Sequence, residues 1–293
     1  MGTTRSTAEY PLGEGDLQWT CTEWLEEHID DDLLLIDCQP NIHDYIQEHI
    51  PGAVYMNPEL FRVSEDGVPG RYIPDDAAQA LFRRVGVDSS RPTVIYTGTG
   101  PFKGWGDGLE QTMVAYSLLR FGAKDLWLLD GGIDTWKYEG RQMSQLYPEI
   151  KSSRFGVGVQ SDLFVEYDDF KDMKDNDDVI LLDARPAEVY QGQGPWRKPG
   201  HIPGAVNLPW KSLFHDDNTR LFNTDEEIKS IAEAHGATPD KRIICSCGTG
   251  REATAEFLIF KYLLGYDDVL IYEGSYTEWL HRLQPTVTGP NPR

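Results

Sequence analysis

Two cysteines close an apolar run at residues 243–247, and a glycine-rich segment follows them directly. From Cys247 the sequence reads "CGTGRE" and runs into a segment with helical spacing. A cysteine between a strand and a helix lies next to unpaired backbone N–H groups and the positive end of the helix dipole. Both favour the thiolate, which is the nucleophilic form of sulfur. Cys245 lies within the apolar run and is predicted to be a small buried hydrophobic residue. The pattern predicts Cys247 as the nucleophile.

The residues after Cys247 predict a site for a negatively charged sulfur. Gly248 and Gly250 can adopt positive φ, which would let successive amides curl around the sulfur. Arg251 adds a fixed positive charge nearby. Taken alone, however, a cysteine at a strand end is more often a structural residue. A Gly-x-Gly pattern alone is also weak evidence for an anion-binding loop. The structural alternative stays open on this segment alone.

Four segments recur in the same order in the two halves of the chain. The matching pairs are 33–40 with 180–186, 48–58 with 200–210, 93–100 with 243–250, and 122–136 with 265–279. This order predicts a diverged duplication of one domain. We expect a first domain over 1–145, a linker over 146–160 and a second domain over 161–293. When the "GTG" strings are aligned, Cys247 faces Thr97. The first domain is therefore predicted to be non-catalytic.

Short apolar runs alternate with longer helical segments in each half, which predicts an α/β fold. In the second half the expected strands lie near 179–182, 204–207, 242–246 and 269–272, and the clearest helix lies within 252–265. Continuous apolar runs indicate strands covered on both faces, and hence a mostly parallel sheet flanked by helices in each domain. The functional site is expected where such strands end and helices begin.

The two halves differ by insertions beside this same junction. The second half has six extra residues between Asp183 and His201, which bring in Trp196, Arg197 and Lys198. The first half has seven extra residues after its "GTG", within 98–108. We predict that this loop forms one wall of the cleft, with an ordinary surface loop as the equal alternative.

The composition limits the classes of partner and cofactor. The chain has 293 residues and a net charge of −21, so most of its surface repels nucleic acid and anionic membranes. An anionic substrate would need a local cationic pocket. The acidic runs lack the spacing of a calcium loop.

Cysteine number and the N-terminal sequence limit the metal chemistry and the compartment. Four cysteines are too few and too unevenly spaced for a disulfide framework or a zinc site; they are Cys21, Cys38, Cys245 and Cys247. We expect no metal. The first residues lack the apolar core of a secretory signal, and no segment is long and apolar enough to span a bilayer. A cytoplasmic protein is expected, or a periplasmic one if a signal peptide had been removed.

The chain resembles the tandem-domain rhodanese family of thiosulfate and 3-mercaptopyruvate sulfurtransferases. The resemblance rests on "DARPAEVYQG", "GHIPGAVNLPW" and "CGTGREAT" with their first-half counterparts, and it covers about residues 20–280. It implies that Cys247 accepts a sulfane sulfur as a persulfide and passes it to a thiol or cyanide, without a metal or an organic cofactor. The amides of the loop would hold the negative persulfide.

The resemblance also implies the roles of individual residues. The active loop is 247–252, and Arg185 matches a substrate-contacting arginine. Asp183 and His201 match structural residues. The implied substrate-binding set is Arg185, Arg197, Gly248, Thr249, Gly250, Arg251 and Glu252.

Two departures from the family pattern concern the sulfur donor. A second arginine of many members is Val189 here, and the sixth loop position, often Thr or Ser, is Glu252. Arg251 or Arg197 would have to supply the missing charge. Charge close to the reacting atoms suits thiosulfate, and loss of the remote arginine weakens a clamp for the carboxylate of mercaptopyruvate. The small residues of "CGTG" resemble mercaptopyruvate enzymes instead, so that donor is the alternative.

Two other functions compete with sulfur transfer. A phosphatase or arsenate reductase of the same scaffold needs an arginine at the position of Ala253, and Arg251 comes two residues too early. A non-catalytic interaction module would lack the nucleophile in both halves, which Cys247 contradicts. The sequence therefore favours a thiosulfate sulfurtransferase.

Overall fold

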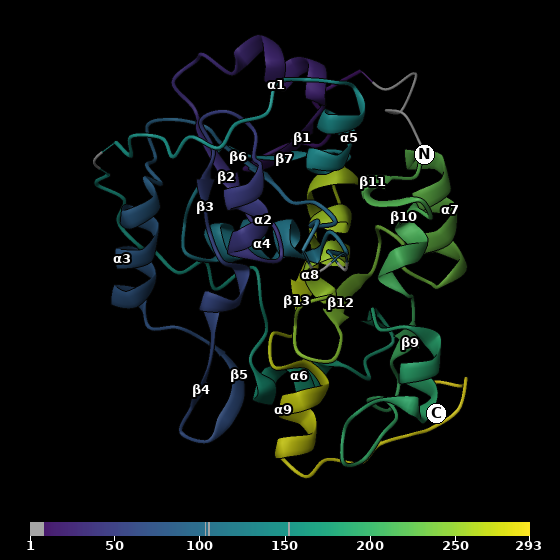
Figure 1. Ribbon diagram of the computed structural model, residues 1–293. Helices are drawn as coiled ribbons and strands as arrows, with labels where there is room; N and C mark the ends of the chain where they lie inside the picture. The colour runs from purple at the N-terminus through teal and green to yellow at the C-terminus, as the bar shows by residue number, and fades with distance from the viewer. Residues whose placement is uncertain (1–8, 103, 105, 152) are drawn as a thin grey trace. The chain divides into compact units, whose positions relative to one another are not determined.

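The structure is a computed structural model, described here over residues 9–102, 104, 106–151 and 153–293 (Figure 1). Its chain divides into two compact units. Unit 1 contains the residues up to Phe61, Ile73–Gln160 and Phe214–Phe222; unit 2 contains Arg62–Tyr72, Ser161–Leu213 and Asn223–Arg293. In the described residues, no helix has the length and apolar character needed to cross a membrane.

Unit 1 is built on a parallel five-stranded sheet with the order β1-β7-β6-β2-β3. Its elements are β1 (Leu17–Thr20), α1 (Thr22–His28), β2 (Leu34–Asp37), α2 (Ile42–Gln47), β3 (Val54–Tyr55), η1 (Pro58–Phe61), α3 (Asp75–Val85), β6 (Thr93–Tyr96), α4 (Leu109–Arg120), β7 (Leu126–Leu129), α5 (Gly132–Tyr138), β10 (Phe214–His215) and β11 (Asn218–Phe222).

Helices cover the sheet of unit 1 because its strands are apolar on both faces. All residues of β2 and β6 are buried. Leu25 of α1 and Trp136 of α5 belong to one core cluster with Leu35 and Val94 of the central strands. Helix α4 is buried over nearly its whole length. This is the burial expected for a parallel sheet between helices.

Unit 2 contains a parallel four-stranded sheet with the order β13-β12-β8-β9. Its elements are β4 (Arg62–Glu65), β5 (Val68–Tyr72), α6 (Tyr167–Met173), β8 (Val179–Asp183), η2 (Val189–Gln193), β9 (Val206–Asn207), η3 (Trp210–Leu213), α7 (Asp225–Ala234), β12 (Arg242–Ser246), α8 (Ala253–Leu258), η4 (Ile259–Leu263), β13 (Val269–Ile271) and α9 (Ser275–His281).

The α/β architecture predicted from the sequence is confirmed. Strands β8, β9, β12 and β13 occupy the four predicted positions, and the predicted helix begins at Ala253 as α8 and continues through η4. Helix α7 begins with a capping box in which Thr224 and Glu227 satisfy each other's backbone N–H groups. The central strand β12 ends at Ser246, so Cys247 is the first residue beyond it.

The two units do not coincide with the two halves of the sequence, because each unit includes a hairpin from the other half. Hairpin β4–β5 comes from the first half of the sequence but belongs to unit 2, where β5 lies beside α9 (Figure 1). Arg71 of this hairpin pairs with Glu166 of the same unit at 2.8 Å. Hairpin β10–β11 comes from the second half but belongs to unit 1, where the backbone N–H of Phe222 donates to Asp130 at 3.2 Å.

The segment 146–160, predicted as a linker, belongs to unit 1. The backbone N–H of Gly158 donates to the carbonyl of Phe121 at 3.1 Å, and Arg83 donates to the carbonyl of Phe155 at 2.7 Å. Phe155 is buried against Phe82 of α3. This segment is therefore packed along the helices of unit 1.

Candidate active site

The sulfur of Cys247 lies at the carboxyl end of β12, inside a loop held by its neighbours in unit 2. The residue is fully buried. The backbone N–H of Gly250 donates to its Sγ at 3.0 Å, and its own N–H donates to Oγ of Ser275 at 3.1 Å. The carbonyl of Cys247 accepts from the N–H of Tyr276 at 3.0 Å. The backbone on both sides of the sulfur is thus fixed by the start of α9.

Both glycines of the loop are required, but for different reasons. Gly250 has φ of +82°, and a Cβ there would lie 2.5 Å from the carbonyl oxygen of Glu273. Gly248 is not in the left-handed region; a Cβ there would lie 2.6 Å from the ring of Trp196. The expectation of positive φ thus holds for Gly250 only, and Gly248 makes room for an aromatic ring from the second-half insertion.

The environment of Cys247 opposes a resting thiolate. Burial raises the pKa of this thiol, and the carboxylate of Glu252, which hydrogen-bonds it, raises it further. The backbone N–H groups of Ala253 and Thr249 act in the opposite direction but are weaker. This result reverses the expectation from the helix start, because desolvation and a nearby like charge outweigh the amides. Burial and the Glu252 carboxylate thus both favour the neutral thiol of Cys247 over its thiolate.

Arg185 lies beside the loop but is buried against its own aspartate. Its Nε and Nη2 donate to the two carboxylate oxygens of Asp183 at 2.8 and 2.5 Å, and Nη2 also donates to the carbonyl of Gly200 at 2.9 Å. The guanidinium lies over the rings of Tyr276 and Trp196, with its carbon 4.4 and 5.1 Å from the ring centroids. Its Nη1 is buried without a hydrogen-bond partner in the described part of the chain.

Asp183 and His201 make contacts suited to holding the backbone. Asp183 orients the guanidinium of Arg185, as above. His201 is fully buried, with its two ring nitrogens 3.0 and 3.1 Å from the carbonyl oxygens of Tyr190 and Asn291. In unit 1, His49 has the same kind of contacts with Tyr45 and Leu146. Because the pattern occurs in both units, it belongs to the shared scaffold.

The remaining residues predicted for the site differ in exposure. Thr249 is exposed, and Arg251 and Glu252 are partly buried, at the rim of the loop. Arg197 is exposed on the insertion, next to Trp196, whose Nε1 donates to Thr277 at 3.0 Å. Thr277 in turn donates to the carbonyl of Gly248 at 2.8 Å. The insertion thus braces the loop through Trp196, and Arg197 lies outside this bracing.

One arginine at the loop was missed by the sequence analysis. Arg62 of hairpin β4–β5 donates from Nη2 to the carbonyls of Thr249 and Glu273, at 2.8 and 2.6 Å. A Cβ on Gly250 would lie 2.8 Å from the same nitrogen. No local pattern points to Arg62, because it lies 185 positions before Cys247 in the chain.

A second missed residue is Glu256, one turn into α8. It is fully buried, and neither carboxyl oxygen has a hydrogen-bond partner in the described residues. Burial raises the pKa of Glu256 well above its ordinary value, and Asp183 and Glu252 add to the shift. The signal was present in the sequence as one acidic residue in an otherwise apolar helical face. Burial therefore favours the protonated form of Glu256.

Unit 1 has the same junction without a thiol. Thr97 follows β6 as Cys247 follows β12, and its carbonyl accepts from the N–H of Ile133 at 3.0 Å. The hydroxyl of Thr97 faces the carbonyl of Cys38 at 3.2 Å and Glu110 at 3.5 Å. Residues 103 and 105 of the loop 98–108 lie outside the described residues. The duplicated scaffold is preserved here, with Thr97 at the position that Cys247 occupies in unit 2.

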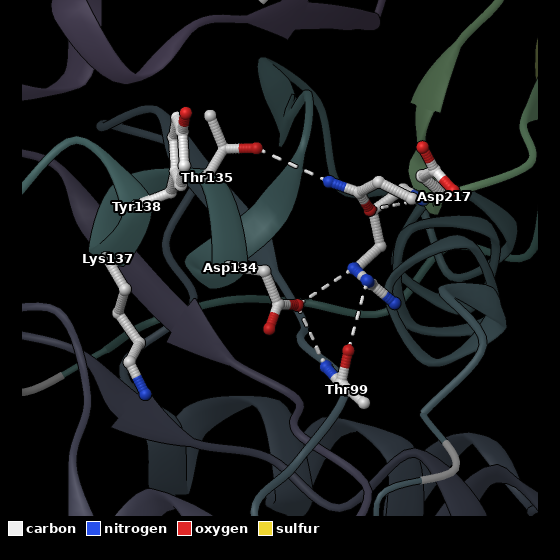
Figure 2. Close-up of a pocket in the computed structure, with 8 residues that line it drawn as sticks. Thr99, Asp134, Thr135, Lys137, Tyr138 and Asp217 are labelled. Carbon is white, nitrogen blue, oxygen red and sulfur yellow. Dashed lines mark hydrogen bonds and ion pairs between the residues drawn. The ribbon is translucent and has the colours of Figure 1, made fainter. Parts of the chain in front are cut away.

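A cavity of about 400 Å³ lies next to this junction, within unit 1 (Figure 2). Arg220, from hairpin β10–β11, contacts Asp134 and Thr99, and Figure 2 labels both of these partners. Its Nε lies 3.0 Å from the carboxylate of Asp134, and it donates to the hydroxyl of Thr99 and the carbonyl of Gly106 at 3.1 Å each. The cavity is lined by Thr99, Asp134, Thr135, Lys137, Tyr138, Asp217, Asn218 and Arg220. The positive charge of Arg220 is therefore neutralised by a carboxylate from its own unit.

The described residues contain no group of three or more His, Cys, Asp or Glu side chains that could hold a metal ion. All four cysteines are free thiols.

Comparison with known proteins agrees with this arrangement. The model of the rhodanese-like domain matches residues 22–139 and again residues 166–282. A Synechococcus elongatus protein named for thiosulfate sulfurtransferase activity is 32% identical over 95% of this chain and 87% of its own length. The sulfur carrier protein TtuD of Thermus thermophilus is 30% identical, covering 88% of this chain and 92% of the relative. The 3-mercaptopyruvate sulfurtransferase of Escherichia coli is 27% identical over the same shares.

Solved structures share the fold at lower identity. The wild-type structure of EanB superposes with a TM-score of 0.81 and 22% identity, covering 92% of this chain and 69% of that one. With both halves matched by the same domain and with relatives that are sulfurtransferases, this chain belongs to the rhodanese family of sulfurtransferases as a protein of two rhodanese-like domains.

Proposed function

We propose that the protein transfers a sulfane sulfur from thiosulfate, through a persulfide on Cys247, to a thiol or to cyanide. In the first half-reaction the Cys247 sulfur attacks the outer sulfur of thiosulfate. A new S–S bond forms, the S–S bond of thiosulfate breaks, and its electron pair leaves with sulfite. In the second, the acceptor attacks the outer sulfur of the persulfide and releases the cysteine sulfur.

The observation that carries the proposal is the N–H of Gly250 donating to Sγ of Cys247 at 3.0 Å, inside a loop that follows the central strand. A donor already aimed at the sulfur stabilises it as charge develops, without reorganisation of the loop. The carboxyl end of β12 is also where ligands are expected to bind in such a sheet.

Glu252 is the base that this reaction requires. Its carboxylate hydrogen-bonds the Cys247 thiol, and one of its oxygens is buried without a hydrogen-bond partner in the described residues. When the sulfur attacks, the thiol proton passes to this carboxylate. The proton returns to Cys247 when the acceptor has taken the sulfur, so no proton is lost over the cycle.

Thiosulfate is favoured as the donor because the Cys247 loop itself carries a positive charge, on Arg251. Arg251 lies in the loop, while Val189 replaces the arginine expected farther away for the carboxylate of mercaptopyruvate. The alternative donor, 3-mercaptopyruvate, is supported by the small residues of the loop and by relatives that carry that name. The predicted groups near the donor are Arg185, Arg197, Gly248, Thr249, Gly250, Arg251 and Glu252.

A phosphatase or arsenate reductase fits the loop less well. The position at which such an enzyme needs its arginine is Ala253, which is fully buried and begins α8. The loop therefore closes too early to surround a tetrahedral oxyanion with an arginine at its end.

Intact-protein mass spectrometry tests the proposal. Incubation with thiosulfate should add one sulfur atom to the wild-type protein, and cyanide should then remove it. Cys247→Ser should show neither change. If the wild-type protein gained no mass from thiosulfate but gained it from 3-mercaptopyruvate, thiosulfate would be the wrong donor. The proposed persulfide on Cys247 would still stand.

A further inference from the structure

A single peptide group connects Arg62 with the sulfur of Cys247. The carbonyl oxygen of the peptide between Thr249 and Gly250 accepts a hydrogen bond from Nη2 of Arg62 at 2.8 Å. The N–H of this same peptide donates to Sγ of Cys247 at 3.0 Å. The positive guanidinium and the sulfur thus lie at opposite ends of one peptide dipole.

The guanidinium of Arg62 is held by hydrogen bonds, and no carboxylate of the described residues forms an ion pair with it. It also donates to the carbonyl of Glu273 at 2.6 Å and lies 4.5 Å from the ring centroid of Tyr72. Its Nε and Nη1 are buried without hydrogen-bond partners in the described residues. Both of its acceptors are neutral carbonyl groups, so it keeps its charge at the loop.

Arg220 provides the contrast within unit 1. Like Arg62, it comes from a hairpin of the opposite half of the sequence and donates to the loop at the end of the central strands. Arg220 is ion-paired with Asp134, however, and that loop has Thr97 in place of the nucleophile. The arginine that keeps its charge is therefore in the unit that holds the reactive sulfur.

A cation on a carbonyl oxygen strengthens the N–H donor of the same peptide, because hydrogen bonds in series polarise one another. A charged donor also makes a stronger bond than a neutral one. In addition, the hydrogen bond from Arg62 to the Thr249 carbonyl opposes a rotation of the peptide that would turn its N–H away from the sulfur, and the bond to Glu273 holds the guanidinium in place. Both effects favour a negatively charged sulfur over a neutral one.

We infer that Arg62 is a positioning residue of the Cys247 loop, which acts through the Thr249–Gly250 peptide to stabilise the anionic forms of that sulfur. These forms are the thiolate and, resting on the proposed function, the persulfide. The catalytic unit then includes a residue from the first half of the chain.

The test is the rate of alkylation of Cys247 by iodoacetamide, measured against pH and located by mass spectrometry in the full-length protein. Arg62→Lys keeps the charge, and Arg62→Gln keeps a hydrogen-bond donor without the charge. We expect the Gln variant to react at least about fivefold more slowly than the Lys variant at pH 8, because fewer of its molecules carry the thiolate.

Arg71→Lys and Arg71→Gln are the matched controls, because Arg71 lies on the same hairpin and pairs with Glu166 near the surface. These two variants should react alike. Equal rates for Arg62→Lys and Arg62→Gln would overturn the inference, and so would an equal loss in Arg71→Gln, which would indicate docking of the hairpin instead. Alkylation needs no sulfur donor, so this outcome is separate from a failure of thiosulfate to transfer sulfur.

Discussion

The carboxylate of Glu252 hydrogen-bonds the thiol of Cys247 and, after burial, is the largest influence that raises the pKa of that thiol. The group proposed as the base is therefore also one that raises the pKa of the thiol. Replacing it by Gln should change two rates in opposite directions. Alkylation of Cys247 at a fixed pH should become faster, because the pKa of the thiol falls and more thiolate is present. Sulfur transfer should fall by about 100-fold, because the proton acceptor is lost.

Glu256→Gln is the control for this variant. Glu256 is a buried acid on the same segment, and its raised pKa favours the neutral form, so a neutral amide of the same shape should replace it with little change. Both rates should stay near the wild-type values. If Glu252→Gln instead accelerated both alkylation and sulfur transfer, the role of Glu252 as a base would be wrong. Its effect would then be only to raise the pKa of the Cys247 thiol.

Cys247 should be the only cysteine needed for sulfur transfer. Cys247→Ser should abolish turnover with thiosulfate and cyanide, while Cys21→Ser, Cys38→Ser and Cys245→Ala should keep it. Cys38 and Cys245 are fully buried, so their variants are expected to lose stability rather than activity. Thermal melting beside the assay separates these effects. Comparable turnover in Cys247→Ser would contradict the proposed mechanism.

Arg251 should contribute more to the catalytic efficiency with thiosulfate than to that with 3-mercaptopyruvate. Arg251→Ala should reduce the catalytic efficiency with thiosulfate by about tenfold, since it removes a charge close to the reacting sulfur. The measurement is kcat/KM for both donors with one acceptor, in wild type and variant. A wild-type preference for mercaptopyruvate, or an unchanged efficiency with thiosulfate in Arg251→Ala, would refute the electrostatic argument.

A thiol placed in unit 1 should not restore the reaction. In a Cys247→Ser background, Thr97→Cys puts sulfur at the equivalent strand end, but beside Glu110 and with Arg220 neutralised by Asp134. We expect no added sulfur after thiosulfate by intact mass. A persulfide on the new cysteine would show that the silent half lacks only the thiol.

The buried pair Asp183–Arg185 should dominate the local stability of unit 2. Asp183→Ala leaves the guanidinium of Arg185 buried without its carboxylate, and should lower the free energy of unfolding by about 3–5 kcal/mol. Asp268→Ala breaks the more exposed pair with Arg242 and should cost about 1 kcal/mol or less. Urea unfolding of both variants compares the two costs. Equal losses would mean that Asp183 is not the carboxylate that compensates Arg185.

The hydrophobic periodicity and the internal repeat were sufficient to predict the elements of the second half and its candidate nucleophile. Apolar runs predict the strands that begin at Val179 and Arg242 and the helix that begins at Ala253. Each run can be recognised because the spacing of its apolar residues matches the faces of the element that are buried. Cys247 could be identified because a strand end and two glycines are features of consecutive residues. The alignment of the two halves then separated it from Thr97.

What the sequence did not reveal depends on contacts between distant residues. The hairpin that carries Arg62 is recognisable as a turn, but nothing within it specifies that it belongs with residues from Ser161 onward. The direction of the pKa shift of Cys247 depends on the competition among burial, Glu252 and the loop amides, whose strengths depend on distance. Arg185 was expected to face a ligand, and its pairing with Asp183 emerges only once the strand end is folded.

The reciprocal placement of the two hairpins has a consequence for biosynthesis. A ribosome releases the N-terminal half of a chain first, and domains generally fold as units as they emerge. Here β10–β11, which ends at Phe222, belongs to the unit formed mainly by the first 160 residues. A nascent chain that stops at Gln160 therefore lacks part of its first unit and leaves β4–β5 without its partners in the second. Two products made by dividing the gene at this position would therefore each lack a hairpin of the unit that they mainly form.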